Sequence, residues 1–430
     1  MINKTSHSSA LVAGGGIAGI QAALNLADLG VRVYLIEQGP SLGGHLLQLD
    51  KIYPTDHCSF CLIWPLMLRC RDHASITLIK DAKVHQIDGQ PGDFHVTVLK
   101  DPVYVLSERC TGCGECARVC PVDIQPGGKT AHRKAIFRPF EHAVPDSYIL
   151  DPENCNRCGL CADRCPFGAI NLEADSRQEV ICVEAVVLAT GFEPYDPAPL
   201  KEYGYGLSPD IMTSLEFEAW ISDTGPNRGR VLRPSDGSPP RSIAFIQCVG
   251  SRDKRAHTYC SGFCCMHAVK EAIWACERAP NLQSYIFYTD MRAFGREFQD
   301  YIAESQKTGR VEYIRSRPGR VMPKDGHLEV RFEDTIMREM KILHADMVVL
   351  STAIIPSRGF EIKGSHGRSQ SDQSGFIRVP SGSGQTLQTG HPGIFTCGCC
   401  HGPSDAVESA VQAKAAAGQA MDSLSRREGR

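Results

Sequence analysis

Apolar and polar positions near the start of the chain alternate in the order of a strand, a helix and a second strand. The run ALVAG (Ala10–Gly14) predicts a buried strand, a helical pattern continues to about Leu29, and VRVYLIE (Val31–Glu37) predicts the second strand. The turn after the first strand has the spacing G-x-G-x-x-G, with Gly14, Gly16 and Gly19. These glycines allow a tight turn and let a pyrophosphate approach a helix N-terminus. The pattern therefore predicts a dinucleotide-binding βαβ unit.

Later residues extend this predicted site. Glu37 ends the second strand, where a carboxylate can bond a ribose hydroxyl, and Gly43 and Gly44 suit a further close approach of backbone to cofactor. Two other stretches each predict a strand that ends in a glycine turn, EAVVLATGFEP (184–194) and GIFTCGCC (393–400). With the helical pattern over 404–420, they resemble the segments that complete the FAD site of thioredoxin-reductase-like flavoproteins. That resemblance assigns Thr190, Gly191 and Gly398 to the cofactor, and it places Cys399 where the family usually has an aspartate.

Two runs of four cysteines lie between these flavin segments. Each run has the spacing C-x-x-C-x-x-C-x-x-x-C-P, and the second begins 45 residues after the first. Bacterial two-cluster ferredoxins have this spacing, with three cysteines of a run on one [4Fe-4S] cluster and the fourth on the other. Structural zinc and inert buried thiols are the alternatives, and two complete runs argue against both. The predicted ligands are Cys110, Cys113, Cys116, Cys120, Cys155, Cys158, Cys161 and Cys165.

A second α/β pattern follows residues 194–240, which have the composition of a linker. After the strand IAFIQ (Ile243–Gln247), four cysteines stand where a phosphate-binding glycine loop would be expected, Cys248, Cys260, Cys264 and Cys265. We expect Cys260 and Cys264 on one helix, where a spacing of four places both sulfurs on one face. Ligands bind beyond the strand ends of open α/β sheets, and soft thiolates select iron-sulfur or zinc. The loop predicts a third cluster; buried core cysteines and a redox disulfide are the alternatives.

Eight cysteines remain outside these predicted sites. Cys182 and Cys276 lie in apolar patterns, which predicts buried structural roles. Cys58-x-x-Cys61 follows the Gly43-Gly44 turn, and the C-G-C-C segment closes the flavin site, so a dithiol, a fourth cluster and simple packing all stay open for them. The remaining cysteines are Cys58, Cys61, Cys70, Cys182, Cys276, Cys397, Cys399 and Cys400.

The composition narrows the class of protein. The chain has 430 residues, of which 42% are hydrophobic and 22% charged, and a net charge of -3. These values are typical of a globular protein and argue against general nucleic-acid binding. Cysteine arrays in a long chain without an export signal favour metal ligation over disulfides. Because no apolar stretch approaches the roughly 20 residues that span a bilayer, we expect a cytoplasmic protein that meets the inner face of a membrane only through partners.

Together these patterns predict an α/β fold with two Rossmann-like domains of the thioredoxin-reductase-like flavoprotein type and an inserted two-cluster bacterial ferredoxin domain. The FAD-binding domain is expected in three parts, and the Ser- and Gly-rich stretch 364–384 is expected to return the chain to it. The expected boundaries are 1–105 (FAD domain, first part), 106–172 (ferredoxin), 173–240 (FAD domain return strand and linker), 241–363 (second Rossmann-like domain with the four-cysteine site) and 364–430 (FAD domain, last part).

With these motifs in place, nearly the whole chain resembles the A subunit of heterodisulfide reductase, most specifically in CVGSRD (248–253) and YCSGFCCMHAVKEA (259–272). It is also similar to the A subunit of the quinone-interacting membrane-bound oxidoreductase, notably in RVLRPSDG (230–237). The resemblance implies FAD, several [4Fe-4S] clusters with one on the four loop cysteines, and work in a multi-subunit complex. It also implies further heterodisulfide-reductase-like subunits as partners, with a membrane quinone subunit or a hydrogenase-type donor. Some members of the family bifurcate electrons at the flavin.

We therefore expect an oxidoreductase subunit that relays or splits electrons between FAD and three [4Fe-4S] clusters, with a fourth cluster left open. One alternative is an NAD(P)H-dependent flavoprotein reductase with ferredoxin clusters, of the glutamate synthase small-subunit type. The missing second glycine fingerprint argues against it. The other alternative is a non-enzymatic redox sensor or scaffold. The sequence identifies no catalytic residue and neither the terminal donor nor the terminal acceptor.

Overall fold

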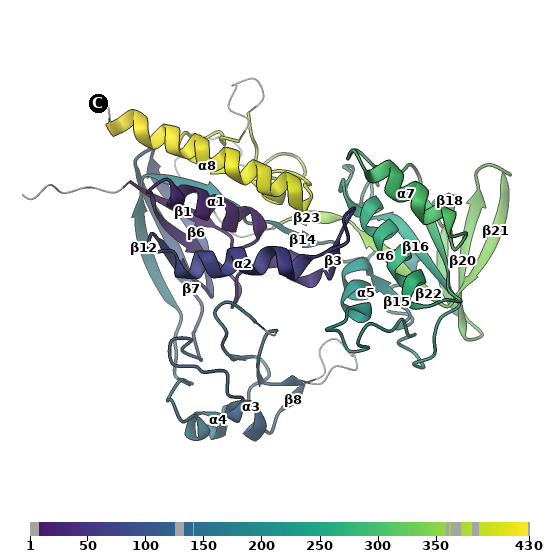
Figure 1. Cartoon of the computed structure of the whole chain (residues 1–430), viewed down its shortest axis with the longest axis horizontal. Coiled ribbons are helices and arrows are strands. Elements are labelled where there is room, and N and C mark those ends of the chain that lie inside the picture. Colours follow the sequence, from purple (N-terminus) through teal and green to yellow (C-terminus); the bar gives the residue numbers. More distant parts are fainter. Residues whose placement is uncertain are drawn as a thin grey trace, which may run out of the picture.

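The computed structural model describes residues 8–124, 133–140, 142–357, 361–362, 371–380 and 387–428. Figure 1 shows three parts: one α/β unit that carries both α1 and the C-terminal α8, a small lobe with α3 and α4, and a second α/β unit with α5, α6 and α7. This is the expected α/β architecture with an insertion in the first unit.

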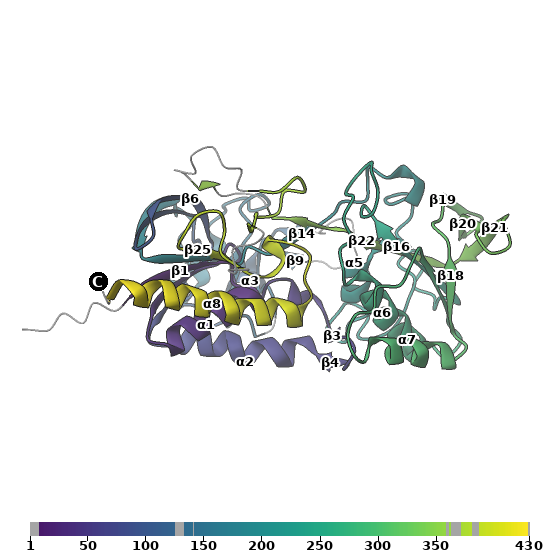
Figure 2. The ribbon, with the colours of Figure 1, turned by 90° about the horizontal axis from the view of Figure 1, so that it is seen from above.

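The first unit is built on a parallel sheet of five strands in the order β25-β13-β1-β2-β5. Figure 2 shows α1, α2 and α8 side by side on one face of this sheet. Small and aliphatic side chains fill the core between helices and sheet, which lets α1 and α8 pack closely. The elements are β1 (Ser9–Ala13), α1 (Ile17–Asp28), β2 (Arg32–Ile36), α2 (Ser59–Asp72), β5 (Ile76–Ile79), β13 (Ala185–Leu188), β25 (Ile394–Thr396) and α8 (Ala406–Glu428).

A second sheet covers the opposite face of the first unit, in the order β12-β7-β6-β24. A separate apolar core lies between the two sheets. Its strands are β6 (Ala82–Gln90), β7 (Asp93–Lys100), β12 (Arg177–Val183) and β24 (Glu361–Ile362). The cysteine-rich lobe is inserted between β7 and β12. Its elements are α3 (Glu115–Val119), β8 (Asp123–Ile124), β9 (Arg133–Lys134), β10 (Ile136–Phe137), β11 (Ile149–Leu150) and α4 (Leu160–Arg164).

The second unit repeats the parallel arrangement with the strand order β15-β22-β16-β17-β18. A three-stranded antiparallel meander, β19-β20-β21, packs against it. The elements of the second unit are β15 (Ile211–Thr213), α5 (Ser214–Ile221), β16 (Ser242–Val249), α6 (Cys264–Arg278), β17 (Gln283–Tyr288), α7 (Phe298–Lys307), β18 (Val311–Arg315), β19 (Arg320–Lys324), β20 (His327–Asp334), β21 (Glu339–Ala345) and β22 (Met347–Thr352). An antiparallel ribbon of β14 (Phe192–Pro194) and β23 (Ile354–Pro356) connects the two units.

Three local expectations were wrong. The stretch 194–240 is not only a linker, because β15 is a strand of the second unit's parallel sheet and α5 begins with a capping box between Thr213 and Glu216. Helix α6 begins at Cys264, so Cys260 lies in the loop before it. Cys182 is exposed, because strand alternation turns its neighbours, and not Cys182 itself, toward the core. Most of the expected return segment 364–384 lies outside the described residues.

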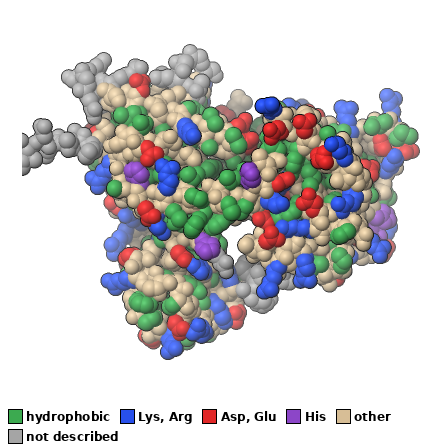
Figure 3. All heavy atoms as spheres, viewed as in Figure 1, with side chains coloured by type: hydrophobic (Ala, Val, Ile, Leu, Met, Phe, Trp, Pro, Cys, Tyr) green, Lys and Arg blue, Asp and Glu red, His purple; other side chains and the backbone are tan. Residues whose placement is uncertain are grey.

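The surface shows one further feature. In Figure 3, hydrophobic side chains gather over α2 and continue toward the second unit. Of the helices in the described ranges, none has both the length and the apolar character that crossing a bilayer requires.

Candidate functional site

A large cavity, which we call the nucleotide cavity, lies where the first and second units meet. Its volume is about 1340 Å³. The first unit contributes Gly14–Ala18, Glu37–Lys51 without Asp50, and the turn Thr190–Gly191 to its wall. The second unit contributes side chains from α5 and the start of α6, among them Ser214, Cys264, His267 and Lys270. The cavity is therefore a shared space between the predicted flavin site and the cysteine loop.

The turn between β1 and α1 presents bare backbone to this cavity. Gly14 has φ +109°, and a Cβ there would lie 2.2 Å from the carbonyl oxygen of Ala189. A Cβ on Gly44 would lie 3.0 Å from the Cα of Gly16. Larger residues do not fit at these positions, so the backbone N–H groups at the start of α1 stay open to an anionic ligand. The first turn of α1, Ile17–Ile20, is uncharged and leaves the positive helix end available.

Glu37 braces the glycine turn from the second strand. Its Oε2 accepts a hydrogen bond of 2.6 Å from the Gly15 N–H, and its Oε1 accepts one from the Gly39 N–H. Burial raises the pKa of the Glu37 carboxyl, while the two backbone N–H groups act in the opposite direction. The carboxylate oxygens can each accept a further bond, so bracing the turn and holding a ribose hydroxyl are compatible roles.

Two predicted cofactor glycines have a packing role. Gly19 and Gly398 are not among the described residues that line the nucleotide cavity. A Cβ on Gly19 would lie 1.7 Å from the Gly14 carbonyl oxygen, and one on Gly398 would lie 2.9 Å from the Cβ of Ala18. Both glycines therefore let α1 approach its neighbours closely. Beside Gly398, Cys397 and Cys399 do line the cavity, as does Asp405, an acidic residue that the sequence did not single out.

The two cysteine runs of the inserted lobe fold in the same way. Each run leads through a glycine in the left-handed region, Gly114 (φ +80°) or Gly159 (φ +82°), into a five-residue helix, α3 or α4. The positions two residues after each first cysteine, Gly112 and Arg157, also have positive φ. The Arg157 N–H donates to Cys155 Sγ at 3.4 Å, so such a turn directs backbone donors toward sulfur.

The lobe brings cysteines of different runs together. A small pocket is lined by Cys155, Cys158 and Cys161 of the second run and by Cys120, the fourth cysteine of the first. Three cysteines of one run with the fourth of the other is the ligand exchange that two-cluster ferredoxins use. The donor set of thiolates, the backbone N–H donors and the apolar surroundings suit an iron-sulfur cluster.

The four loop cysteines of the second unit also come together. Cys248 ends β16 at a register shift and has φ +62°, which turns its side chain out of the ladder. Electrostatic interactions join its sulfur to those of Cys260 and Cys265, and the Cys264 and Cys265 thiols share a hydrogen bond. Burial raises the pKa of the Cys248 thiol to about 11. A bound metal deprotonates such a thiol, and its positive charge stabilises the buried thiolate. The four cysteines therefore fit a cluster.

A buried charge network, which the sequence did not reveal, lies next to the loop cysteines. Lys270 of α6 is 1% exposed, and its Nζ donates to both carboxylate oxygens of Glu218, at 2.7 and 2.6 Å, and to the Lys51 carbonyl oxygen at 2.9 Å. His267 Nε2 lies 3.0 Å from Glu218 and 3.5 Å from Glu271, both fully buried. The sequence offered one sign of this network: His267, Lys270 and Glu271 stand three and four residues apart in an otherwise apolar helix. Glu218 was missed because it lies in the supposed linker.

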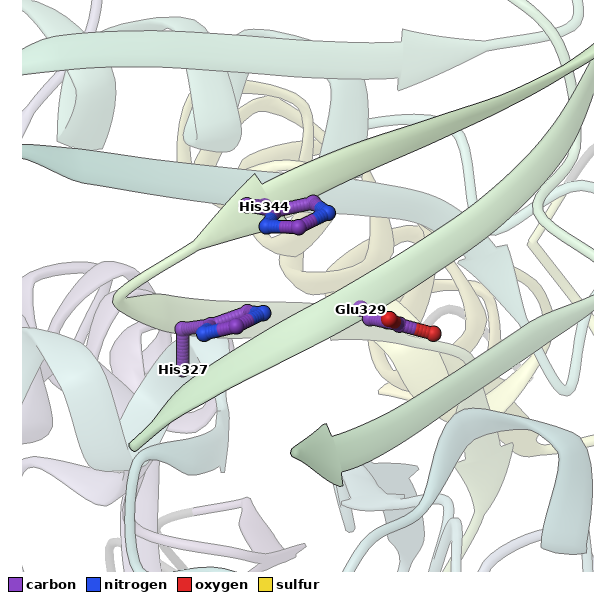
Figure 4. Close-up of side chains that lie close together, drawn as sticks. All are labelled: His327, Glu329 and His344. Carbon is purple, nitrogen blue, oxygen red and sulfur yellow. The ribbon is translucent and has the colours of Figure 1, made fainter. Parts of the chain in front are cut away.

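A further group of potential metal ligands lies on the meander, far from these motifs in sequence. Figure 4 shows His327 and Glu329 on one strand and His344 on its neighbour. Their ligand atoms lie within 4.8 Å of one another, and the two imidazoles stack with centroids 4.3 Å apart. Lys324 and Arg331, at 2.8 and 2.9 Å, already pair with the Glu329 carboxylate. Two cations around one carboxylate disfavour a third, so we assign no site here.

Comparisons with known proteins agree with both predicted cofactor regions. Residues 109–169 match the family model described as a 4Fe-4S dicluster domain, and residues 10–48 match the model described as FAD dependent oxidoreductase. The second iron-sulfur A subunit of the CoB--CoM heterodisulfide reductase of Methanopyrus kandleri is 41% identical over 420 residues, which are 96% of this chain and 64% of that protein. The A subunit of the H(2):CoB-CoM heterodisulfide,ferredoxin reductase of Methanothermobacter marburgensis is 39% identical over 419 residues, 96% and 63% of the two chains.

Over almost its whole length, the chain is similar to the A subunits of heterodisulfide reductases. It spans less than two thirds of the length of the curated relatives it matches. Among solved structures, the thioredoxin reductases of T. acidophilum and Lactococcus lactis have TM-scores of 0.54 and 0.55 at 12% and 13% identity, and each comparison covers 98% of this chain and 98% and 100% of the respective reductase. These similarities confirm the thioredoxin-reductase-like fold. FAD and [4Fe-4S] clusters are the cofactors of the matched regions.

Proposed function

We propose that the chain is an electron-transfer subunit that relays electrons between FAD and [4Fe-4S] clusters within a heterodisulfide-reductase-like complex. One observation carries the proposal: Gly14–Gly16 and Cys264 line the same cavity. A dinucleotide held by the glycine turn and a cluster held by the cysteine loop would therefore share one space. In reductases of this fold, the second unit would bind a nicotinamide dinucleotide through a glycine loop; here cysteines stand at that position.

The residues that would hold FAD follow from the cavity wall. Gly14, Gly16, Gly43 and Gly44 would give the cofactor close access to the backbone. The start of α1 would hold the pyrophosphate, and Glu37 would bond a ribose hydroxyl. Thr190 and Gly191 complete the same wall. A bound flavin supplies the conversion between two-electron and one-electron transfer. Lys270 adds a positive charge on the cavity wall, and its contacts with Glu218 and Lys51 fix its position.

We infer three cluster sites. The first ferredoxin cluster has three ligands from the first run and the last cysteine of the second, and the other ferredoxin cluster has the reverse combination, which the pocket around Cys120 supports. The third site is the cysteine loop of the second unit. The ligand sets are Cys110, Cys113, Cys116 and Cys165; Cys155, Cys158, Cys161 and Cys120; and Cys248, Cys260, Cys264 and Cys265.

The partners proposed for this chain are other subunits of such a complex. The printed names of its relatives describe them as subunits of CoB-CoM heterodisulfide reductases, and one name includes H(2), the heterodisulfide and ferredoxin together. One donor with two acceptors supports the proposal that the flavin divides electrons between two routes. The finer alternatives for the partner are a hydrogenase-type donor and a membrane quinone subunit. We propose that the chain works in the cytoplasm and meets a membrane only through such a partner.

The test is an iron and flavin count on anaerobically purified variants. Cys264→Ala should lose about four irons per chain, the content of one cubane, and keep its FAD. Cys276→Ala is the matched control, because Cys276 is buried on the same helix but lies beside Ser284 at 3.3 Å and does not belong to the loop site. It should keep all of its iron.

The same preparation separates the competing functions. Retention of every cluster in Cys264→Ala would remove the third site and with it the proposed route. Rapid bleaching of the flavin by NADH in the intact chain would instead favour the NAD(P)H-dependent reductase. A chain whose clusters take up no electrons reversibly would favour a scaffold.

A further inference from the structure

Cys58 and Cys61 remain outside every site described above. Neither is among the described residues that line the nucleotide cavity, and neither belongs to the inserted lobe. They form a Cys-x-x-Cys pair at the start of α2, a helix of 14 residues. The preceding hairpin, β3 (Lys51–Ile52) and β4 (His57–Cys58), places Lys51 opposite Cys58. Because Lys51 lines the nucleotide cavity, the pair lies one strand away from the cavity wall.

The two sulfurs are arranged unequally. Cys58 is the N-cap of α2, and its Sγ accepts a hydrogen bond of 3.3 Å from the Cys61 N–H. The Cys61 thiol also donates to the Cys58 sulfur, and this bond raises the pKa of the Cys61 thiol. The first turn of α2, Ser59–Leu62, is uncharged. Cys58 Sγ is therefore the acceptor of two donors at the positive end of a helix, and the Cys61 thiol is one of those donors.

The pair is accessible and its support is rigid. Cys61 is exposed and Cys58 is half-buried. Ser59, between them, is fully buried, and its N–H donates to the Asp50 carbonyl oxygen at 2.9 Å, which anchors the helix start. Leu62, one residue further along α2, is 43% exposed. A bulky reactant can therefore reach the cysteines without a change of fold.

A mononuclear metal site fits this place less well. Within the described part of the chain, no group of three His, Cys, Asp or Glu ligand atoms within 4.8 Å of one another includes Cys58 or Cys61. The hydrogen bond between the two thiols holds their sulfurs side by side, and a Cys-x-x-Cys pair at a helix N-terminus is the arrangement of disulfide oxidoreductases. The Cys58–Cys61 pair therefore lacks a third metal ligand but is suited to closing a disulfide.

We propose that Cys58 and Cys61 form a redox-active dithiol that exchanges with an external disulfide, with Cys58 as the nucleophile and Cys61 as the resolving thiol. Cys58 gives its proton to water, and its thiolate attacks one sulfur of the external disulfide. That S–S bond breaks, one half leaves and takes up a proton, and the other half stays on Cys58. The Cys61 thiol then loses its proton and attacks the Cys58 sulfur, which releases the second half. The external disulfide gains two electrons and two protons, and the chain loses them as it forms the Cys58–Cys61 bond.

The experiment uses the anaerobic chain with its FAD and clusters in place. The protein is equilibrated in mixtures of reduced and oxidised dithiothreitol, quenched with acid and alkylated, and its peptides are mapped by mass spectrometry. Cys58 and Cys61 should lose their label together as the mixture becomes more oxidising. Cys182, which is exposed on β12 and has no neighbouring cysteine in sequence, should stay labelled throughout.

Single variants test the assigned roles. Cys61→Ser should trap glutathione on Cys58, whereas Cys58→Ser should form the adduct at Cys61 about tenfold more slowly, because it has neither the N-cap position nor a thiol donor. An insulin arm beside the glutathione disulfide arm distinguishes a protein disulfide from a small one. Both variants should keep the iron and FAD of the parent chain. Equal adduct rates at Cys58, Cys61 and Cys182 would overturn the proposal, and so would loss of iron from either variant, which would make the pair cluster ligands.

Discussion

Replacement of Lys270 by Met tests the buried charge network most directly. The side chains of Lys270 and Glu218 are 1% and 0% exposed, and three hydrogen bonds of 2.6–2.9 Å hold the ammonium group. Met has a similar length without the charge. In Lys270→Met, the Glu218 carboxylate keeps the Asp50 N–H at 2.9 Å and His267 at 3.0 Å but loses its counter-charge. Removal of one partner of a buried pair costs about 3–5 kcal/mol, because the other charge stays desolvated.

The assay is hydrogen exchange of the α6 amides in the anaerobic protein, which reports the local free energy of opening. A multi-domain chain with cofactors has no single free energy of unfolding, so a local measurement is needed. At 1.36 kcal/mol per factor of ten, Lys270→Met should lower α6 protection roughly 10²- to 10⁴-fold. The control is Lys307→Met on α7, whose pair with Glu304 is 70% and 69% exposed. Lys307→Met should leave the protection of α6 unchanged, because solvent screens an exposed pair.

A third variant separates charge from packing. The double variant Glu218→Gln with Lys270→Met removes both charges, so it should recover most of the lost protection. If the double variant is as unstable as Lys270→Met alone, the lost packing of the lysine stem and not an unpaired carboxylate explains the effect. Equal protection in Lys270→Met and Lys307→Met would refute the burial of the pair.

Three further outcomes follow from the structure. Gly14→Ala should lose bound FAD on gel filtration because its Cβ meets backbone, whereas Gly30→Ala, at φ +87° with open space around it, should keep FAD; FAD retention in both would contradict the fit of the turn. Cys120→Ser should weaken the cluster of the second run and leave the cluster of the first run intact. Electron paramagnetic resonance of the reduced protein distinguishes the two clusters. Loss of only the first run's cluster would contradict the proposed exchange of ligands between the runs. Burial opposes ionisation of Glu218, but Lys270 and His267 together lower its pKa to about 2, so the stabilisation it gives should be complete above pH 4.5 and be lost toward pH 2. Hydrogen exchange of α6 checks this loss, and Glu218→Gln should abolish it.

The local pattern of the chain determined the elements around the glycine turn. The ends of β1, α1 and β2 lie within one or two residues of the expected ones, because strand alternation, helical period and glycine turns are properties of neighbouring residues. The two ferredoxin runs could also be recognised from the sequence, because binding a cluster requires a fixed cysteine spacing that does not depend on the surrounding residues. In the second unit, the strands β16, β17, β18 and β22 could be expected from their apolar runs, but β15 could not.

Contacts between distant segments depended on the tertiary structure. Cys120 joins the cysteines of the second run only because the lobe folds back on itself. Glu218 reaches Lys270 because β15 adds to the edge of the second unit's parallel sheet and places α5 against α6. The sequence around Glu218 does not indicate that pairing. Spacing and period are local properties of a chain, so its sequence alone determined the strands, the turns and the cysteine runs. Which buried faces meet depends on the packing of the whole molecule, and only that packing placed the glycine turn and the cysteine loop around one cavity.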